Sequence, residues 1–391
     1  MQLGIDVLFD EAKDLVAGKN IGLLVHKASQ NAKKQHTLDR FLKEKICHVK
    51  AIFTPEHGLD STTPYMQAVE TTTHSSNNIP VYSLYGATQQ SLRPTAKSLQ
   101  GIDTLVIDLQ DIGTRYYTYI WTTLLCMETC AKYKKRVIIC DRPNPINGLN
   151  VEGEFNQEGY TSFVGLYPVP VRHGMTIGEM AHFLNDTHDI GCDLTVLQME
   201  RWQRKWYMDE TGLPWINPSP NIRSVTQALL YPGMCLLEGT NVSEGRGTDS
   251  PFEVAAAPFI RPDEVIDMMN EFNFKGVTYE ATEIHPNDDK WKGEKIPGVR
   301  LNITDRENFH SYRTGIGLIW SLYTLYHEHG FQWRTSTYEF VDDIPAIDLL
   351  FGYYILREGV QKHLPLSEIS EWFSNAPLHY LRQRKPYLFY D

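Results

Sequence analysis

The chain has 391 residues, a length that at roughly 150 residues per domain indicates two domains or three. Its 37 basic and 48 acidic residues leave a formal charge of −11, which argues against broad binding to nucleic acid or to anionic membranes. Hydrophobic residues make up 42% and charged residues 22%, so the composition is that of a folded protein with a sizeable core and excludes global disorder.

The N-terminal segment carries no export or membrane signal. Residues 1–6 lack the basic start of a signal peptide, and no apolar run reaches the roughly 18 residues of a membrane span. We expect a cytoplasmic protein from the sequence as it stands, and an exported one only if a signal peptide has been removed. The six cysteines form no CxxC pair and no zinc spacing, which predicts free thiols and no metal site.

Strand and helix patterns alternate through the first 145 residues. Short apolar runs predict strands at 21–25, 49–53, 80–84, 104–107 and 136–140, and helical patterns fall at about 33–45 and 116–133. This alternation is typical of an open, mostly parallel α/β sheet.

The rest of the chain changes pattern twice. Residues 146–250 are rich in loops, with a helix at 176–186 and a strand at 194–199. From 251 onward come a helix at 262–272, strands near 277–283 and 298–304, a helix at 312–328 and a mixed helical tail. We therefore predict an α/β domain over residues 1–250 and a smaller α+β domain, packed against it, over residues 251–391.

Carboxylates follow three of the predicted strands, at 54–58, 108–111 and 141–144. Ligands of open α/β sheets bind outside the carboxyl ends of the strands, so we expect a site at this edge. The motifs GxGxxG, GxxxxGK[ST], GxSxG and HExxH are all absent from the sequence. Their absence argues against a dehydrogenase, an NTPase and a standard α/β-hydrolase, and we expect a site without a cofactor.

The residues at these strand ends allow both chemical and structural interpretations. Glu56 fits a general acid oriented by His57, or else a solvated residue in a turn. Asp108 and Gln110 point to the same side if the strand continues, whereas Asp111 also fits the cap of the following helix. The clustering of polar and phenolic side chains favours a functional role for this segment.

Two later segments carry further candidates. Thr176 and Glu179 fit a T-x-x-E capping box, which gives Glu179 a structural role and leaves His173 free to reach a ligand. The glycine-punctuated loop 238–248 holds two carboxylates, an amide and an arginine. It follows an apolar run, which favours a site over a plain surface loop, and Arg246 fits a bidentate grip on a carboxylate.

Six ordered motifs give the chain a resemblance to a known family. They are TPEHG at 54–58, DLQDIGTRYYTY at 108–119, DRPNPING at 141–148, VRHGMTIGE at 171–179, PSPN at 218–221 and YPGMCLLEGTNVSEGRGT at 231–248. In these motifs the chain resembles the bacterial exo-acting β-N-acetylmuramidases, glycoside hydrolases that remove N-acetylmuramic acid from the non-reducing ends of peptidoglycan fragments. The resemblance implies a Rossmann-like N-terminal domain, a smaller C-terminal domain closing a cleft, and peptidoglycan-derived saccharides or muropeptides as substrates.

The resemblance also implies which residues form the site. It makes the glutamate at position 56 catalytic, and we assign Glu56 the role of general acid. The second group stays open: Asp108, Asp111 or Glu244 activates water or attacks directly, or the acetamido group of the substrate attacks instead. The other residues expected to line the cleft are His57, Gln110, Arg115, Tyr119, Asp141, Arg142, Asn144, His173, Asn221, Glu238, Asn241 and Arg246.

The expected sugar sets one further requirement. N-acetylmuramic acid carries a lactyl carboxylate, and a protein of net charge −11 needs a local cation to bind it. Arg246, Arg115 and Arg142 are the candidates for this cation.

Two segments depart from the family pattern. After Gly58 the chain reads 59–63 (LDSTT) in place of an arginine-glycine stretch, and the first strand leads into 25–29 (VHKAS) in place of an asparagine-rich turn. These departures motivate an alternative, an amino-sugar or muropeptide binding protein that kept the cleft and lost catalysis. A third, weaker alternative is a sugar-nucleotide transferase, which no phosphate-binding loop supports.

Overall fold

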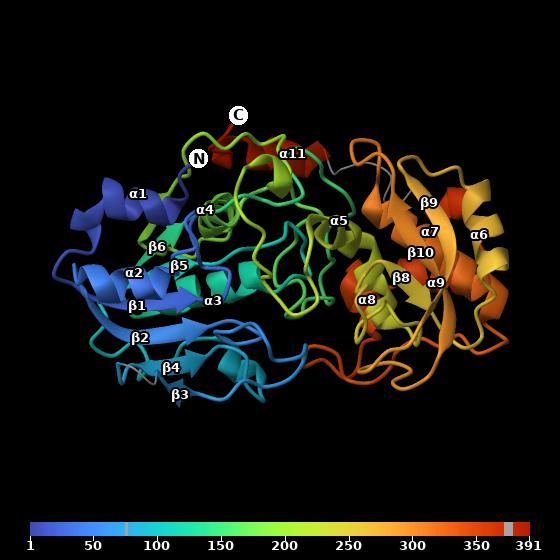
Figure 1. The fold of residues 1–391 in the computed structure, drawn as a ribbon, viewed down its shortest axis with the longest axis horizontal. Helices are drawn as coiled ribbons and strands as arrows, with labels where there is room; N and C mark the ends of the chain where they lie inside the picture. Colours follow the sequence, from blue (N-terminus) through green and yellow to red (C-terminus); the bar gives the residue numbers. More distant parts are fainter. Residues whose placement is uncertain (75–76, 371–377) are drawn as a thin grey trace.

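The computed structural model of the chain describes residues 1–74, 77–370 and 378–391. Its larger sheet has the strand order β3-β4-β2-β1-β5-β6-β7, and every neighbouring pair is parallel except β3 with β4 (Figure 1). The strands are β1 Asn20–Val25, β2 His48–Thr54, β3 Thr72–Thr73, β4 Pro80–Ser83, β5 Thr104–Asp108, β6 Arg136–Cys140 and β7 Leu194–Leu197. The predicted mostly parallel α/β sheet is confirmed.

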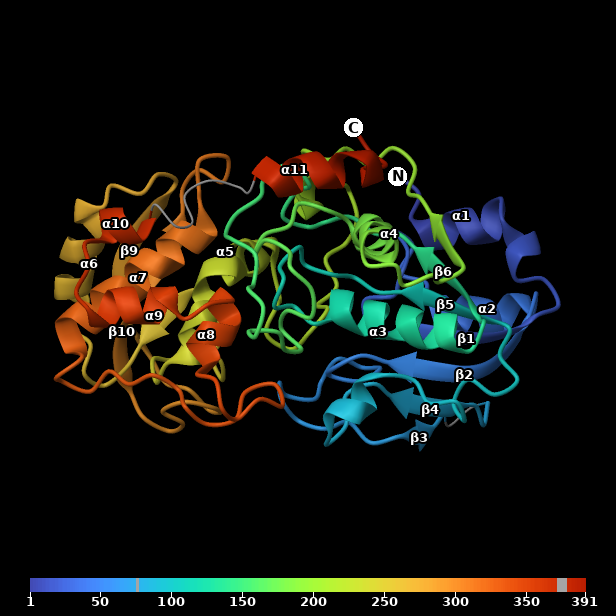
Figure 2. The same ribbon diagram turned by 180° about the vertical axis from the view of Figure 1, so that it is seen from behind.

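Helices cover both faces of this sheet, which explains the continuous apolar runs of its central strands. Helices α1 (Gly4–Asp10) and α2 (Thr37–Glu44) pack on one face, and α3 (Tyr119–Lys132) and α4 (Ile177–Thr187) pack on the other, the side seen in Figure 2. Leu23 of β1 belongs to the core under α1 and α2, whereas its neighbour Leu24 belongs to the core under α3 and α4. Burying each such leucine contributes roughly 1.5–3 kcal/mol to folding.

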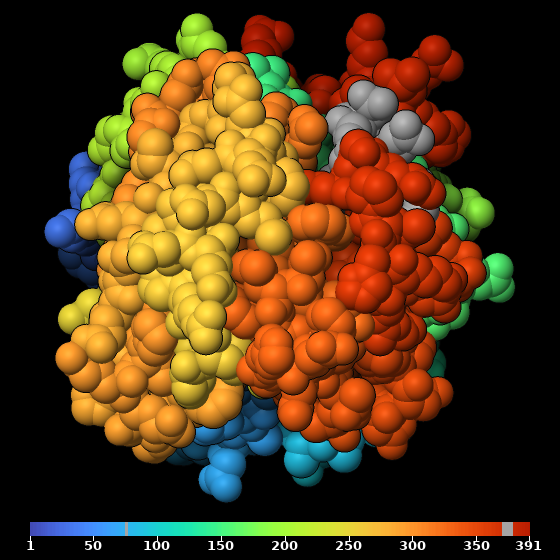
Figure 3. Space-filling model, turned by 90° about the vertical axis from the view of Figure 1, so that its right-hand side faces the viewer, coloured from blue at the N-terminus to red at the C-terminus, as the bar shows by residue number. Residues whose placement is uncertain are grey.

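A second, antiparallel sheet lies at the other end of the molecule. Its order is β8-β10-β9, with β8 Val254–Ala256, β9 Val277–Ile284 and β10 Ile296–Ile303. Helices α6 (Pro262–Glu271) and α7 (Ser311–Tyr326) pack against each other, and α6 contacts both β9 and β10. In Figure 3 the chain coloured yellow to red forms most of this face. The smaller α+β domain is therefore confirmed as a distinct unit of architecture.

The helices between and after these units join them. Helix α5 (Val225–Met234) packs against α7, and the remaining helices are α8 Ala346–Phe351, α9 Ile355–Gln361, α10 Leu366–Ser370 and α11 Leu378–Arg384. The last residues return to the first domain, where Tyr390 OH donates to Asp141 Oδ2 at 2.6 Å, and the two termini lie close together in Figure 1. The domain boundary at residue 250 stays a prediction, although the tail crosses back over it.

The element boundaries differ from the predicted ones for local reasons. Helix α2 begins at Thr37 rather than near 33, because the ring of His36 accepts a hydrogen bond from Leu38 N–H at 3.2 Å and caps it. Helix α3 begins at Tyr119 rather than 116, because the preceding residues form a turn closed by Tyr117 N–H donating to Thr114 O. In the described part of the chain, no helix combines the length and apolarity needed to span a bilayer.

Candidate active site

Glu56 is held in a buried position by the turn that ends β2. After Thr54 the chain reverses through His57 and Gly58, whose φ angles of +72° and +77° lie in the left-handed region that glycine tolerates best. Glu56 is only 6% exposed, so the interpretation as a solvated turn residue is wrong. Its Oε1 accepts from Met66 N–H at 3.1 Å, and its Oε2 accepts from the Thr118 hydroxyl at 2.9 Å.

Glu56 opens onto a hollow of about 40 Å³, the inner pocket. Both domains line it, because Glu56 comes from the end of β2 whereas Tyr338 and Glu339 lie between α7 and α8. The remaining lining residues are His57, Tyr65, Tyr116, Tyr117, Thr118, Tyr119, Val164, Ser219, Asn221, Ile222, Tyr231, Glu238, Arg246 and Phe252. The pocket therefore combines carboxyl groups, phenol rings and one guanidinium group.

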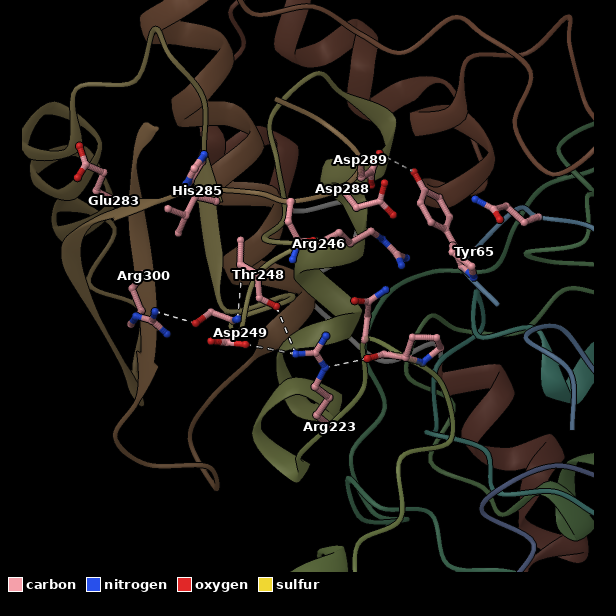
Figure 4. A pocket seen from close by; sticks show the side chains of 18 residues that line it. Tyr65, Arg223, Arg246, Thr248, Asp249, Glu283, His285, Asp288, Asp289 and Arg300 are labelled. Atoms are coloured by element: carbon pink, nitrogen blue, oxygen red, sulfur yellow. Dashed lines mark hydrogen bonds and ion pairs between the residues drawn. The ribbon is translucent and has the colours of Figure 1, made fainter. Parts of the chain in front are cut away.

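A larger hollow of about 640 Å³, the outer cleft, continues from the inner pocket. Tyr65, Asn221 and Arg246 line both, so they form the wall between the two spaces. In Figure 4 Tyr65 extends toward Asp289, and its hydroxyl donates to Asp289 Oδ1 at 3.4 Å. The volume of the outer cleft falls within the roughly 300–1,000 Å³ typical of small-molecule sites.

Arg246 is fixed from several sides at the junction of the two spaces. Its Nη2 lies 2.6 Å from Glu238 Oε1, its Nε lies 2.9 Å from Glu244 Oε1, and its guanidinium carbon lies 3.8 Å from the centre of the Tyr65 ring. Burial acts to raise the pKa of Glu244, but Lys290 and Arg246 hold this pKa below its usual range. Glu244 is thus an ionised group that positions Arg246.

The structure brings six of the predicted residues together. Segments that are far apart in sequence converge on the inner pocket and contribute Glu56, His57, Tyr119, Asn221, Glu238 and Arg246. Burial lowers the pKa of His57 more than Glu56 raises it, and the ring Nδ1–H donates to Thr63 O at 2.7 Å. His57 therefore stabilises the turn beside Glu56 as a neutral group.

The other strand ends form a separate buried group, the edge cluster of Asp108, Asp141 and Arg142. Arg142 pairs with Asp108 through Nε and Nη2 at 2.5 and 2.9 Å, and the Thr37 hydroxyl also donates to Asp108. Asp108 and Asp141 are fully buried and lie outside the described walls of the inner pocket and the outer cleft. The catalytic role predicted for Asp108 stays a prediction, and this placement favours a structural role.

The remaining predicted residues also lie outside the described walls of both spaces and make internal contacts. Arg115 donates to the carbonyl oxygens of residues 154, 169, 350 and 351, and so ties the two domains together. Gln110 donates to two carbonyl oxygens, Asn144 to Met175 O and Asn241 to Gly330 O. The contacts of the last two candidates, His173 with Asp111 at 3.6 Å and Glu244 with Lys290 at 2.8 Å, are equally internal.

Comparison with known proteins decides the family. Family models described as the N-terminal and C-terminal parts of exo-beta-N-acetylmuramidase NamZ match residues 21–226 and 229–390. The peptidoglycan beta-N-acetylmuramidase NamZ of Bacillus subtilis (strain 168) is 37% identical over 390 residues, which cover 100% of this chain and 91% of that protein. The chain belongs to the exo-β-N-acetylmuramidase NamZ family. The resemblance inferred from the motifs and the expected class, a glycoside hydrolase, are confirmed.

Solved structures support the same fold for this NamZ-family chain. Two DUF1343 family proteins from Bacteroides fragilis NCTC 9343 superpose with TM-scores of 0.89 and 0.76, at 29% and 28% identity. Each comparison covers 100% of this chain and 99% of the other protein.

The two segments that depart from the NamZ family pattern both contact site residues. In segment 59–63, Thr63 O accepts from His57. In segment 25–29, the ring of His26 accepts from Gln110 N–H at 3.0 Å and lies edge-on to Tyr119, with ring centres 5.0 Å apart. Burial, reinforced by Arg142, lowers the pKa of His26 well below its usual value. These segments therefore contact residues that line the inner pocket, but contribute no residue to its described wall.

Sequence reasoning expected the second domain to close the cleft but named none of the residues that it contributes after position 250. Tyr338 and Glu339 line the inner pocket, and Asp288, Asp289 and Arg300 line the outer cleft. All five lie far along the chain from the parallel strands whose carboxyl ends were expected to form the site. The one signal in the sequence is an acidic residue between two aromatic ones, Tyr338-Glu339-Phe340, in a loop between helices.

Proposed function

We propose that this chain is an exo-acting glycoside hydrolase that releases N-acetylmuramic acid from the non-reducing end of peptidoglycan fragments, with Glu56 as the general acid. The observation that carries the proposal is the burial of Glu56 in a pocket that it shares with Arg246. The name of the Bacillus subtilis relative supports peptidoglycan-derived saccharides as substrates.

The chemistry assigned to Glu56 is protonation of the leaving oxygen as the bond to the anomeric carbon breaks. Both of its oxygens are held, by Met66 N–H and by the Thr118 hydroxyl, so the carboxyl group has a defined orientation. Water or the acetamido group of the substrate then attacks the anomeric carbon, since Asp108, Asp111 and Glu244 all lie outside the described walls of both spaces.

Arg246 is the cation that we assign to the lactyl carboxylate. It lines both spaces even while it is paired with Glu238 and Glu244. The other two candidates, Arg115 and Arg142, lie outside the described walls of both spaces. A hollow of about 40 Å³ holds water but not a sugar ring. Binding of a whole sugar ring at Glu56 therefore requires the inner pocket to widen.

The test is to identify the monosaccharide that the purified protein releases from disaccharides with N-acetylmuramic acid or N-acetylglucosamine at the non-reducing end. Release of N-acetylmuramic acid from the first and no release from the second is expected. Release of N-acetylglucosamine alone would reject the assigned substrate.

A catalytically altered binding protein is the alternative, because segment 59–63 departs from the family pattern next to His57 and Glu56. Calorimetry distinguishes the two. Tight binding of the muramic-acid disaccharide with no turnover would favour the binding protein.

A further inference from the structure

Lys290 lies in the connection between β9 and β10, outside the described walls of the inner pocket and the outer cleft. Its side chain is 14% exposed, and its ammonium group donates to three oxygen atoms. These are Leu237 O and Val242 O, both at 2.9 Å, and Glu244 Oε2 at 2.8 Å. An ammonium group has three N–H donors, so each donor of Lys290 has a partner inside the protein. Lys290 is therefore a cation in a fixed position.

The connection between β9 and β10 also docks on loop 238–248 through two other residues. Asn287 N–H donates to Gly247 O at 2.8 Å, and Trp291 Nε1–H donates to Asn241 O at 2.7 Å. Gly247 has a φ angle of +74°, and a Cβ atom at this position would lie 2.5 Å from a backbone oxygen of the connection. Contacts on both sides of the lysine therefore hold this loop in place.

The charges around Arg246 are balanced with the help of Lys290. Arg246 lies within ion-pair distance of two carboxylates, Glu238 at 2.6 Å and Glu244 at 2.9 Å. The side chains of Glu238 and Glu244 are only 3% and 1% exposed, so solvent ions screen these charges little. Lys290 supplies the second cation, which makes this group of four neutral. In the described part of the chain, Arg246 and Lys290 are the ion-pair partners of these two carboxylates.

A ligand carboxylate adds one negative charge to this neutral group. Without Lys290, Arg246 alone would compensate two carboxylates, and the ligand would meet a net negative charge, which is unfavourable in a buried site. The neighbouring Asp289 is itself a carboxyl group and cannot replace the missing cation. The ability of Arg246 to attract an anion therefore depends on Lys290.

We propose that Lys290 is a positioning residue that determines specificity: it holds loop 238–248 and neutralises Glu244, and so leaves Arg246 able to bind the lactyl carboxylate of N-acetylmuramic acid. Lys290 acts through Glu244 and does not touch the substrate. The inference rests on the proposed function, in which Arg246 is the lactyl-binding cation, and adds to it a residue from the second domain.

The test compares two ligands of similar shape, N-acetylmuramic acid and its methyl ester, in which the lactyl group has lost its charge. Inhibition constants against a chromogenic muramoside measure how strongly each variant prefers the acid. We expect the wild type to prefer the acid, and Lys290→Met to lose roughly tenfold or more of this preference, because it removes one charge from a buried network. A purely structural role would weaken both ligands alike. An unchanged preference in Lys290→Met would therefore overturn the proposal.

Two variants separate the charge of Lys290 from its packing. Lys290→Arg keeps the positive charge, so it should retain most of the preference for the acid. Lys292→Met is the matched control and should behave like the wild type, because the side chain of Lys292 is 65% exposed and pairs with Asp288 at the surface. A loss in Lys290→Arg as large as that in Lys290→Met would contradict the role of the charge.

A double variant keeps the proposal testable if Lys290→Met does not fold. Removing Lys290 alone leaves a buried carboxylate with too little compensation, which destabilises the protein. Lys290→Met combined with Glu244→Gln restores the charge balance, so we expect this double variant to fold and to prefer the acid about as strongly as the wild type. A folded double variant without this preference would overturn the proposal, whether or not Lys290→Met can be purified.

The same measurement separates this inference from the proposed function. If the wild type prefers the acid, Arg246→Gln loses the preference and Lys290→Met keeps it, the inference fails and the proposed function stands. If the wild type binds the acid and the ester equally, the assignment of Arg246 to the lactyl carboxylate fails, and this inference fails with it.

Discussion

The edge cluster and the inner pocket both begin at the carboxyl ends of parallel strands, yet their charges are compensated differently. In the edge cluster, Asp108 faces the guanidinium group of Arg142 across two short contacts. In the inner pocket, the donors to Glu56 among the described residues are neutral, and Glu56 lines this space together with Glu339. The first arrangement stabilises a fold, and the second leaves Glu56, within the described part of the chain, without a charged partner at the wall of a pocket.

The comparison also shows what a carboxylate at a strand end means. β5 and β6 end in Asp108 and just before Asp141, and both side chains are fully buried by other segments of the chain. β2 ends in a turn that presents Glu56 to the second domain instead. A position at the carboxyl end of a strand is therefore not sufficient to give a carboxylate a catalytic role. Its role also depends on whether neighbouring segments cover the side chain or leave it facing a pocket.

Asp108→Asn is expected to have the largest effect, on stability. It leaves Arg142 buried without a charged partner, so the free energy of unfolding falls by about 3–5 kcal/mol. Urea unfolding measures this loss, and the exposed Asp39→Asn on nearby α2 should lose far less. An Asp108→Asn variant as stable as the wild type would show that this ion pair does not stabilise the fold.

Arg246→Lys tests the pocket side of the comparison. Lysine cannot hold Glu238 and Glu244 and also present a planar fork to a ligand carboxylate. Losing a charged hydrogen bond of about 1.5–3 kcal/mol raises KM for the muramic-acid substrate by roughly 10- to 100-fold. Steady-state kinetics check this, with Arg223→Lys on the rim of the outer cleft as the matched variant. An unchanged KM in Arg246→Lys would remove it as the lactyl-binding group.

Asp141 gives the edge cluster a pH-dependent contribution to stability. Burial raises the pKa of Asp141 to about 7, although the Tyr390 and Thr176 hydroxyl groups donate to it. The folded state therefore binds a proton that the unfolded state releases near pH 4. Between about pH 4 and pH 7 stability falls as pH rises, by up to about 1.4 kcal/mol for each pH unit.

Urea unfolding across this range checks the slope. Asp141→Asn should lose the contribution of this group, and Asp39→Asn should keep it. The assignment would be contradicted if the stability of Asp141→Asn changed with pH as much as that of the wild type.

Thr118→Val is expected to have the smallest effect, on the orientation of Glu56. It removes one donor from Oε2, and a single hydrogen bond of about 1 kcal/mol corresponds to a rate loss of roughly fivefold. Thr118→Ser keeps the hydroxyl group and should keep the rate. Equal rates in Thr118→Val and the wild type would show that this bond does not orient the acid.

Much of the first domain could be predicted from the sequence. Runs such as 136–140 are apolar because both faces of the strand are buried, and the observed β6 has the same bounds. The capping box of Thr176 and Glu179 is also present as predicted. Helix α5 was not predicted, because Pro232 lies inside it and breaks the usual pattern.

The site was predictable only in part, for a physical reason. Glu56 and Arg246 stand in motifs, so their convergence was expected and the structure places them together. Glu339 lies in a two-residue turn with a left-handed backbone. Neither glutamate nor phenylalanine is favoured in such a turn, so the sequence does not predict it. Arg115 was wrongly expected to line the cleft. It donates instead to carbonyl oxygens of the second domain, and a contact with a distant backbone cannot be inferred from the motif around Arg115.

The most direct test of the account compares Glu56→Gln with Asp108→Asn in one assay, the rate at which each releases N-acetylmuramic acid, normalised to the folded fraction. Glu56→Gln should lose a factor of about 100 to 10,000 while folding normally, since that is what a general acid contributes. Asp108→Asn should keep close to the wild-type rate for each folded molecule. A Glu56→Gln variant with the full wild-type rate would contradict the central claim that the inner pocket, and not the edge cluster, carries the chemistry.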